Sequence, residues 1–183
     1  NAPMDVFLVR KLGLPGQEEY AIGAIASGGV RGLNRDAVDQ LGINSAMIDQ
    51  IAVREQAELD RRQHAYRGER PEIELAGKTV LIVDDGLATG STMRAAIAAL
   101  RLRQPARIVV AVPVAAEVTC HLLRTEADEI VCAATPSPFY GVGQWYDNFD
   151  QTTDDDVRQL LVRAERERRT KHRLLGSSDF QSS

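Results

Sequence analysis

Two adjacent carboxylates, followed by a loop rich in small and hydroxylated residues, are the group in this sequence best suited to chemistry. Asp84 and Asp85 come directly after an apolar run at 80–83. A helical pattern of apolar residues begins at Met93. A strand, a short loop of this kind and a helix N-terminus together present backbone N–H groups and the positive end of the helix dipole to an anion. The loop between the acids and the helix consists of Gly86, Leu87, Ala88, Thr89, Gly90, Ser91 and Thr92.

The residue types in this loop suit a phosphorylated sugar. Small residues let the backbone approach a phosphate closely, and the hydroxyls of Thr89, Ser91 and Thr92 can donate hydrogen bonds to it. The two carboxylates would repel a phosphate, so we expect them to bind sugar hydroxyls and a divalent cation beside it. The loop lacks the lysine of a Walker A motif and the glycine spacing of a dinucleotide fingerprint. An ordinary turn between a strand and a helix, with a chance acidic pair, is the alternative.

The segment VLIVDDGLATGST at 80–92 resembles the phosphoribosyl pyrophosphate (PRPP) motif of type I phosphoribosyltransferases. This resemblance implies that Asp84 and Asp85 bind the ribose hydroxyls and Mg²⁺, and that 86–92 bind PRPP, with 88–92 on its 5-phosphate. It implies transfer of the phosphoribosyl group to a nitrogenous base or related acceptor, with release of pyrophosphate. A non-catalytic domain that senses PRPP or a nucleotide, or a module of a fused multidomain protein, remains the alternative.

Two further pairs of residues enter the predicted site through the resemblance. Arg10 and Lys11 end an expected strand at the sheet edge that should carry the motif, where related enzymes place basic residues near the pyrophosphate. Lys11 therefore joins Asp84 and Asp85 as a predicted catalytic residue, and the alternative for the basic pair is a solvated strand end. Phe139 and Tyr140 are expected to stack on the acceptor base, the alternative being packing against the core.

The loop offers no general base, because no carboxylate lies between Asp85 and Thr92. Any proton transfer must therefore come from elsewhere in the protein or from the substrate. In this respect the loop resembles the adenine and orotate branches of the family more than the hypoxanthine-guanine branch.

Apolar runs and helical patterns alternate along the chain, which predicts an α/β fold with a parallel sheet flanked by helices and a small hairpin and hood subregion. The strand before the acidic pair is expected to be buried on both faces. The expected elements are strands at 5–9, 79–83, 107–112 and 129–133, a hairpin of 20–26 with 30–33, and helices at 45–66, 91–103, 115–126 and from about 153.

The boundaries of the predicted domain come from the two ends of the sequence. We expect residues 1–169 to form the phosphoribosyltransferase-like domain and 170–183 to be a flexible tail or linker. Members of the family normally begin with an earlier strand and a pyrophosphate-binding loop, and we find no such segment before Asp5. The expectation is an N-terminally shortened domain with incomplete PRPP binding.

The composition argues against some classes of binding partner. The chain has 183 residues, 44% of them hydrophobic, and a net charge of −4, so it shows no basic excess suited to nucleic acid. No apolar run approaches the ~20 residues that span a membrane. Cys120 and Cys132 are expected to be buried thiols, which favours a cytoplasmic location. The expected partners are PRPP and a small-molecule acceptor; a homo-oligomer or a fused C-terminal domain stays open.

Overall fold

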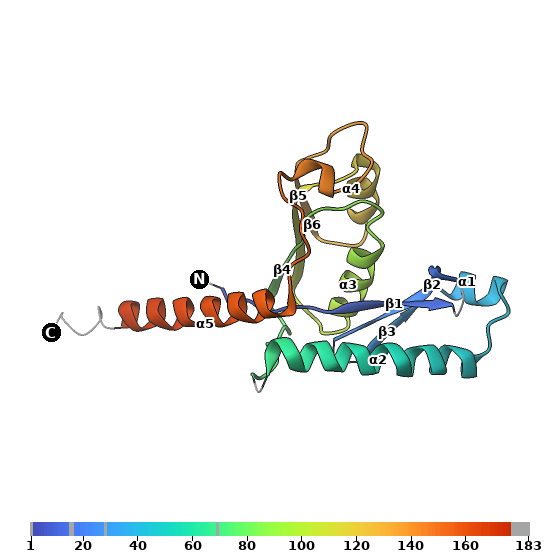
Figure 1. The fold of residues 1–183 in the computed structure, drawn as a ribbon, viewed down its shortest axis with the longest axis horizontal. Coiled ribbons are helices and arrows are strands. Elements are labelled where there is room, and N and C mark those ends of the chain that lie inside the picture. Colours follow the sequence, from blue (N-terminus) through green and yellow to red (C-terminus); the bar gives the residue numbers. More distant parts are fainter. Residues whose placement is uncertain (1, 15–16, 28, 69, 177–183) are drawn as a thin grey trace. The chain divides into compact units, whose positions relative to one another are not determined.

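The computed structural model describes residues 2–14, 17–27, 29–68 and 70–176 of the chain (Figure 1). The chain divides into two compact units, one built from 1–6, 61–73 and 150–183 and the other from 7–60 and 74–149. The elements in chain order are β1 (Val9–Leu14), β2 (Gln17–Ala26), β3 (Val30–Leu33), α1 (Arg35–Gln40), α2 (Ser45–Arg67), β4 (Thr79–Val83), α3 (Ser91–Arg101), β5 (Arg107–Val114), α4 (Glu117–Leu123), β6 (Glu129–Ala134), the 3₁₀ turn η1 (Gly143–Trp145) and α5 (Asp154–Gly176).

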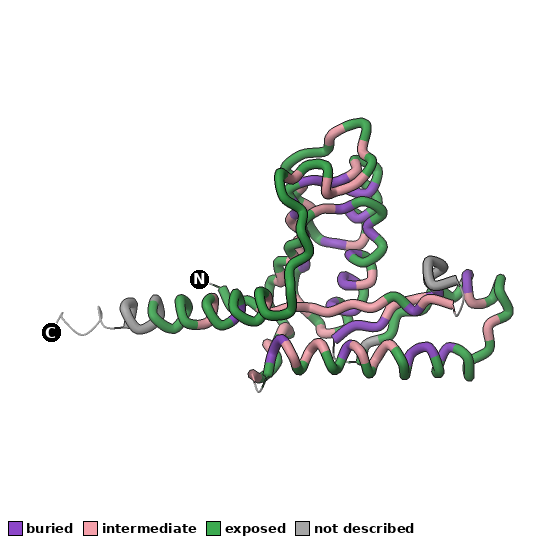
Figure 2. Tube along the Cα trace, in the orientation of Figure 1, coloured by how far each residue is buried: buried purple, intermediate pink, exposed green. Residues whose placement is uncertain are grey.

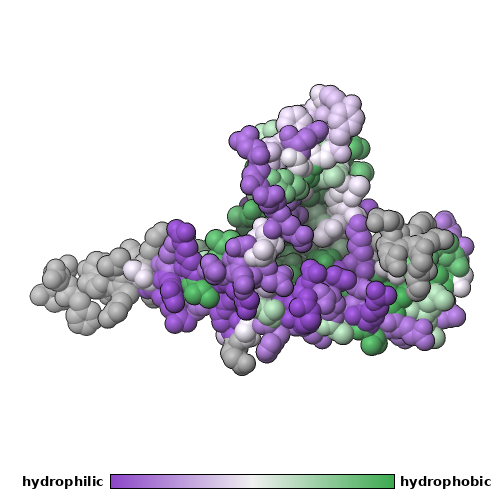
Figure 3. Space-filling view, viewed as in Figure 1, coloured by the Kyte–Doolittle hydropathy of each residue, from purple (hydrophilic) through white to green (hydrophobic). Residues whose placement is uncertain are grey.

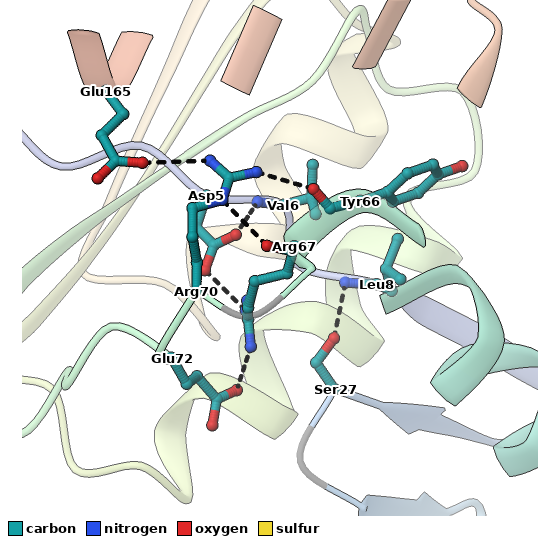
Figure 4. A network of polar contacts seen from close by, with 9 residues as sticks. All are labelled: Asp5, Val6, Leu8, Ser27, Tyr66, Arg67, Arg70, Glu72 and Glu165. Atoms are coloured by element: carbon teal, nitrogen blue, oxygen red, sulfur yellow. Dashed lines mark hydrogen bonds and ion pairs between the residues drawn. The ribbon is translucent and has the colours of Figure 1, made fainter. Parts of the chain in front are cut away.

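The larger unit contains an antiparallel sheet in the order β1-β2-β3, which confirms the predicted hairpin of β2 with β3. Ser27, at the end of β2, is tied to the chain before β1: its backbone N–H donates to Leu8 O (2.9 Å), and its Oγ accepts from Leu8 N (3.1 Å; Figure 4). One face of the sheet packs on α2. The buried side chains of this core are Leu12, Ile22, Ile25, Ile48, Ile51, Ala52 and Leu59.

The same unit contains a parallel sheet in the order β4-β5-β6. The predicted parallel sheet is therefore confirmed, with β5 as its central strand. Helices α3 and α4 provide the cover for one face, because Ile97 and Leu123 are fully or almost fully buried in a core with Ile108 and Val110 of β5. This core positions the loop between β4 and α3.

The other face of the parallel sheet is not buried, contrary to our expectation for the strand at 79–83. Leu81, Val83 and Val131 are 60%, 69% and 46% exposed. Figure 2 colours the trace of the chain by this burial. Successive residues of a strand point to opposite faces, so Val80 and Ile82 enter the core while their neighbours do not. Figure 3 shows hydrophobic side chains at the surface of the part of the molecule that contains β4–β6.

The first strand differs from its prediction. Residues 5–8 are not in a strand, and β1 covers 9–14 instead. Arg10 and Lys11 therefore lie inside β1 rather than at its end, and β1 belongs to the antiparallel sheet, not to the edge of the parallel sheet that carries the motif. The reason is strand pairing, because β1 pairs with β2 as far as Leu14.

The cysteine prediction is also wrong, because Cys120 and Cys132 form a disulfide. Cys120 faces the core from α4, and Cys132 packs against the same core from β6. The two residues are twelve apart in sequence. Packing of α4 against β6 brings their Cα atoms to 7.1 Å. The argument for a cytoplasmic location from free thiols is thereby lost.

The smaller unit is held by charged contacts (Figure 4). The buried Arg67 guanidinium contacts Asp5 (2.7 Å) and Glu72 (3.5 Å), and Arg70 contacts Glu165 of α5 (3.7 Å). Tyr66 donates to Asp154 at 2.6 Å, and this hydrogen bond raises the pKa of the Tyr66 hydroxyl. The helix α5 continues beyond the predicted boundary at 169, to Gly176.

Within the described part of the chain, no helix is both long and apolar enough to cross a membrane.

Two glycines of the hairpin provide a matched test of the antiparallel sheet. A Cβ at Gly23 would lie 2.3 Å from Gly32 O, whereas a Cβ at Gly32 would meet nothing within 4 Å. Gly23→Ala should lower the free energy of unfolding by about 2 kcal/mol, because backbone must move. Gly32→Ala should change it by no more than about 0.5 kcal/mol. Urea denaturation measures both; equal effects would contradict the described pairing of β2 with β3.

Candidate functional site

The loop between β4 and α3 is fixed to the end of β5 by backbone hydrogen bonds. Leu87 N donates to Val114 O (3.0 Å), and Ala116 N donates to Leu87 O (2.9 Å), which makes a parallel bridge between Leu87 and Ala115. The Leu87 side chain is only 2% exposed and belongs to the core. A buried anchor in mid-loop therefore holds the exposed residues on either side of it in place.

Two glycines in the loop lie where no side chain fits. Gly90 has a φ of +70°, and a Cβ there would lie 2.6 Å from Thr119 Cγ2 of α4. A Cβ at Gly86 would lie 2.7 Å from Val142 Cγ1. Thr119 also donates from its hydroxyl to Ala88 O at 2.5 Å. The loop thus packs closely against α4, and this explains why its glycines are needed.

Hydroxyl groups and an uncapped helix end lie side by side after Gly90. The helix α3 begins at Ser91, and the residue before it, Gly90, provides no side-chain cap. Thr89 Oγ1 and Ser91 Oγ are 3.2 Å apart, and Thr89, Ser91 and Thr92 are all exposed. Backbone N–H groups at such a helix start attract an anion, so this part of the loop has the features of a phosphate cradle.

The acidic pair lies at the C-terminal end of β4, and both residues are exposed. Asp84 Oδ1 accepts a hydrogen bond from Asp85 N at 3.0 Å. Desolvation raises the pKa of Asp84 above its ordinary value, and the neighbouring charge of Asp85 raises it further, although the hydrogen bond from Asp85 N opposes both. Bringing a cation to the pair would relieve the repulsion between the two carboxylates.

A magnesium ion fits the donors present here. Mg²⁺ prefers oxygen ligands, usually takes one or two carboxylates and keeps several waters. Among the residues described, no three His, Cys, Asp or Glu side chains gather in one place to form a cation site. Asp84 and Asp85 therefore suit an ion that completes its shell with water and substrate oxygens.

The aromatic residues after β6 differ in their exposure and in their contact with the motif. Tyr140 is 84% exposed and Phe139 is half-buried, and the residue that contacts the motif is Tyr146. Its hydroxyl donates to Asp85 O at 2.6 Å, and its ring lies 5.3 Å from that of Phe149. Sequence reasoning could not assign this contact, because 61 residues separate Tyr146 from Asp85.

The structure separates Arg10 from Lys11. Alternate residues of a strand face opposite sides, and Arg10 points to α2, where its Nε lies 2.6 Å from Glu55 Oε2. Lys11 is exposed and lines a hollow that Ser91 of α3 also lines. Of the predicted basic pair, only Lys11 shares a surface with the motif.

Comparison with known proteins agrees with this geometry. The family model described as "Phosphoribosyl transferase domain" matches residues 9–136. The chain belongs to the phosphoribosyltransferase family. The match includes the acidic pair, the loop and both sheets, so the predicted family and fold are confirmed.

Individual proteins are also similar to this phosphoribosyltransferase domain. The chain is 45% identical over 167 residues to "Putative phosphoribosyl transferase Rv0571c" of Mycobacterium tuberculosis, which covers 91% of the chain and 38% of that protein. It is similar to the crystal structure of TT1426 from Thermus thermophilus, with 38% identity, a TM-score of 0.76, and coverage of 87% of this chain and 75% of that one. A segment of 53 residues is 40% identical to "Bifunctional protein PyrR" of Actinobacillus pleuropneumoniae, 29% of this chain and 30% of that protein. The chain thus spans 38% of the length of the mycobacterial relative.

The coupling within the acidic pair can be measured by titration. Asp85→Asn removes one negative charge but keeps the backbone N–H that Asp84 accepts, so the pKa of Asp84 should fall toward the ordinary value for aspartate. Carbon-detected NMR of the side-chain carboxyl across pH 2–7 reports this change. Asp39→Asn, at an exposed position on α1, is the control and should leave the pKa of Asp84 unaltered. A pKa that stays the same or rises in Asp85→Asn would contradict the described pair.

Proposed function

We propose that this domain transfers the 5-phosphoribosyl group of PRPP to a nitrogenous acceptor and releases pyrophosphate. The observation that carries the proposal is the position of Asp84 and Asp85 directly before a hydroxyl-rich loop and an uncapped helix start. A phosphorylated ribose has its hydroxyls and its phosphate in the matching order. Membership of the phosphoribosyltransferase family supports the same reaction class.

In this proposal the loop and the acidic pair bind different parts of the substrate. The backbone N–H groups at the start of α3, with the hydroxyls of Thr89, Ser91 and Thr92, bind the 5-phosphate. The carboxylates of Asp84 and Asp85 accept hydrogen bonds from the ribose hydroxyls. Residues 86–88 close the loop over the ribose and are fixed by the Leu87 anchor.

The bond to be broken joins C1 of the ribose to the pyrophosphate oxygen, and the bond to be formed joins C1 to a nitrogen of the acceptor. The transition state carries positive charge on the ribose ring, so negative charge from the acidic pair would stabilise this state. When bound, Mg²⁺ supplies positive charge to the departing pyrophosphate. The remaining contribution of the protein is to hold the two reactants in line.

Four other side chains belong to the proposed site. Lys11 is retained as the basic residue near the pyrophosphate, because it is exposed and lines the hollow that Ser91 also lines. Arg10 was expected to act with it, and would have to leave Glu55 to do so. Tyr140 is the more exposed of the two residues proposed to stack on the acceptor, and Phe139 is the other.

A domain that binds PRPP without turnover is the second candidate. The loop itself offers no group to accept a proton from the acceptor, so an enzyme would need such a group elsewhere in the protein or in the substrate. Release of pyrophosphate in the presence of a panel of purine and pyrimidine bases separates the two candidates. An enzyme releases pyrophosphate with at least one base, whereas a sensor binds PRPP and releases none.

The phosphate cradle is best tested at Thr92, because Gly90→Val would also collide with Thr119. Thr92→Glu introduces a negative charge at an exposed position in the first turn of α3, where a glutamate is compatible with the helix. It should weaken ribose 5-phosphate binding at least about tenfold, which is about 1.4 kcal/mol. Thr92→Gln has the same size without the charge and should retain most of the affinity. Isothermal titration calorimetry gives both values; equal affinities would exclude the cradle.

The acidic pair is tested through its dependence on Mg²⁺. The double variant Asp84→Asn, Asp85→Asn should keep its circular dichroism spectrum, since both side chains are exposed, and should lose the increase in PRPP affinity that Mg²⁺ gives. Calorimetric titration of PRPP with and without Mg²⁺ measures this increase. A double variant that still responds to Mg²⁺ like the parent chain would show that the ion binds elsewhere.

A further inference from the structure

The hydroxyl of Tyr146 reaches the acidic pair from a distant part of the chain. It donates to Asp85 O at 2.6 Å, across 61 residues of sequence. Asp85 lies in a bend just after β4, so its carbonyl group is outside the pairing of the parallel sheet. Two residues further on, Leu87 is hydrogen-bonded to the end of β5. The backbone from Asp85 to Leu87 is therefore held at both ends, by a side chain at one and by β5 at the other.

The segment that contains Tyr146 is a tight turn that packs on the start of the loop. The Tyr146 ring lies 5.3 Å from the ring of Phe149. A Cβ at Gly143 would lie 2.8 Å from Phe149 Cδ1, so the chain folds closely on itself here. A Cβ at Gly86 of the loop would lie 2.7 Å from Val142 Cγ1. Close packing as well as a hydrogen bond therefore joins this turn to the motif.

The same segment carries the residues proposed to stack on the acceptor. Phe139 and Tyr140 come just before the turn η1. When the Gln144 amide is oriented with its oxygen toward the donors, that oxygen accepts from Tyr140 N (3.2 Å) and from Trp145 Nε1 (3.0 Å). Tyr140 and Tyr146 are thus linked through one short turn. A continuous chain of contacts therefore joins the acceptor side of the proposed site to the acidic pair.

We propose that Tyr146 is a positioning residue, whose hydroxyl couples the acceptor side of the site to the acidic pair. By fixing the carbonyl group of Asp85, the hydroxyl restricts the directions in which the Asp85 side chain can point. It thereby orients the carboxylate toward the ribose and Mg²⁺. Binding of one reactant changes the affinity for the other through the same hydrogen bond. The inference rests on the proposed function, because it gives Asp85 the same ligands.

Tyr146→Phe tests the hydroxyl by itself, since it retains the ring that packs on Phe149. The variant should stay folded, because Asp85 is exposed and water can hydrogen-bond its carbonyl group. Calorimetric titration with ribose 5-phosphate should show an affinity about fivefold lower or more with Mg²⁺ present, and less than about twofold lower without Mg²⁺. Equal losses in the two conditions would indicate a purely structural role and overturn the proposal, and so would no loss in either.

Tyr66→Phe is the matched control. The Tyr66 hydroxyl also donates at 2.6 Å, to Asp154, and both residues belong to the smaller unit. This variant should change the affinity for ribose 5-phosphate less than about twofold, with or without Mg²⁺. An effect equal to that of Tyr146→Phe would overturn the proposal, because loss of any buried or partly buried tyrosine hydroxyl would then account for the result.

Trp145 provides a second readout that does not depend on turnover. It is the one tryptophan of the chain and directly precedes Tyr146, so its fluorescence reports on this segment. Ribose 5-phosphate with Mg²⁺ should change the fluorescence of the parent chain and should no longer change that of Tyr146→Phe. A response that persists in Tyr146→Phe would overturn the coupling.

The same titration separates failure of the coupling from failure of the proposed function. Amide shifts at 89–92 without a change in Trp145 fluorescence of the parent chain would overturn the coupling and leave the phosphate loop as a binding site. A fluorescence response that depends on Tyr146, without pyrophosphate release from any base, would support the coupling and contradict the transfer reaction. No response of either kind would overturn both.

Discussion

The end of strand β5 is the constraint on which the candidate site depends. Both neighbouring strands pair with β5, and the loop after β4 pairs with its last residues through Leu87. The same stretch continues into α4, whose Thr119 packs on Gly90 and hydrogen-bonds Ala88 O. A short exposed loop is thereby held at a buried strand end from both sides. The acidic pair and the helix start can keep a fixed separation for this reason, and binding of a rigid phosphorylated sugar depends on such a separation.

Much of this site could be predicted from the sequence, because its parts are adjacent along the chain. Residues 80–97 contain, in order, the apolar run, the two acids, the small residues and the helix. This order along the chain was enough to predict which of them lie next to one another. The predicted strand at 79–83 has the bounds of β4, and α3 begins at the predicted Ser91. The hairpin was also predictable, since a glycine turn joins two short strands. In these cases local geometry and the tertiary structure require the same conformation.

The rest depends on contacts between distant segments, which pattern reasoning does not supply. Lys11 and Arg10 are adjacent in sequence, yet pairing of β1 with β2 directs one to the hollow and the other to Glu55. Tyr146 reaches Asp85 only because the chain after β6 folds back over the loop. The disulfide was missed because the packing of α4 on β6 had to be known first. An apolar strand pattern likewise does not tell whether the covering layer lies within the chain, as the exposure of Leu81 and Val83 illustrates.

The binding position of ribose 5-phosphate is the most direct test, measured as amide shifts across the whole chain during an NMR titration. We predict that the largest shifts fall on residues 86–93, at the loop and the first turn of α3, and that addition of Mg²⁺ extends them to Asp84 and Asp85. Saturable shifts confined to other segments, with the amides of 86–93 unmoved, would contradict this prediction.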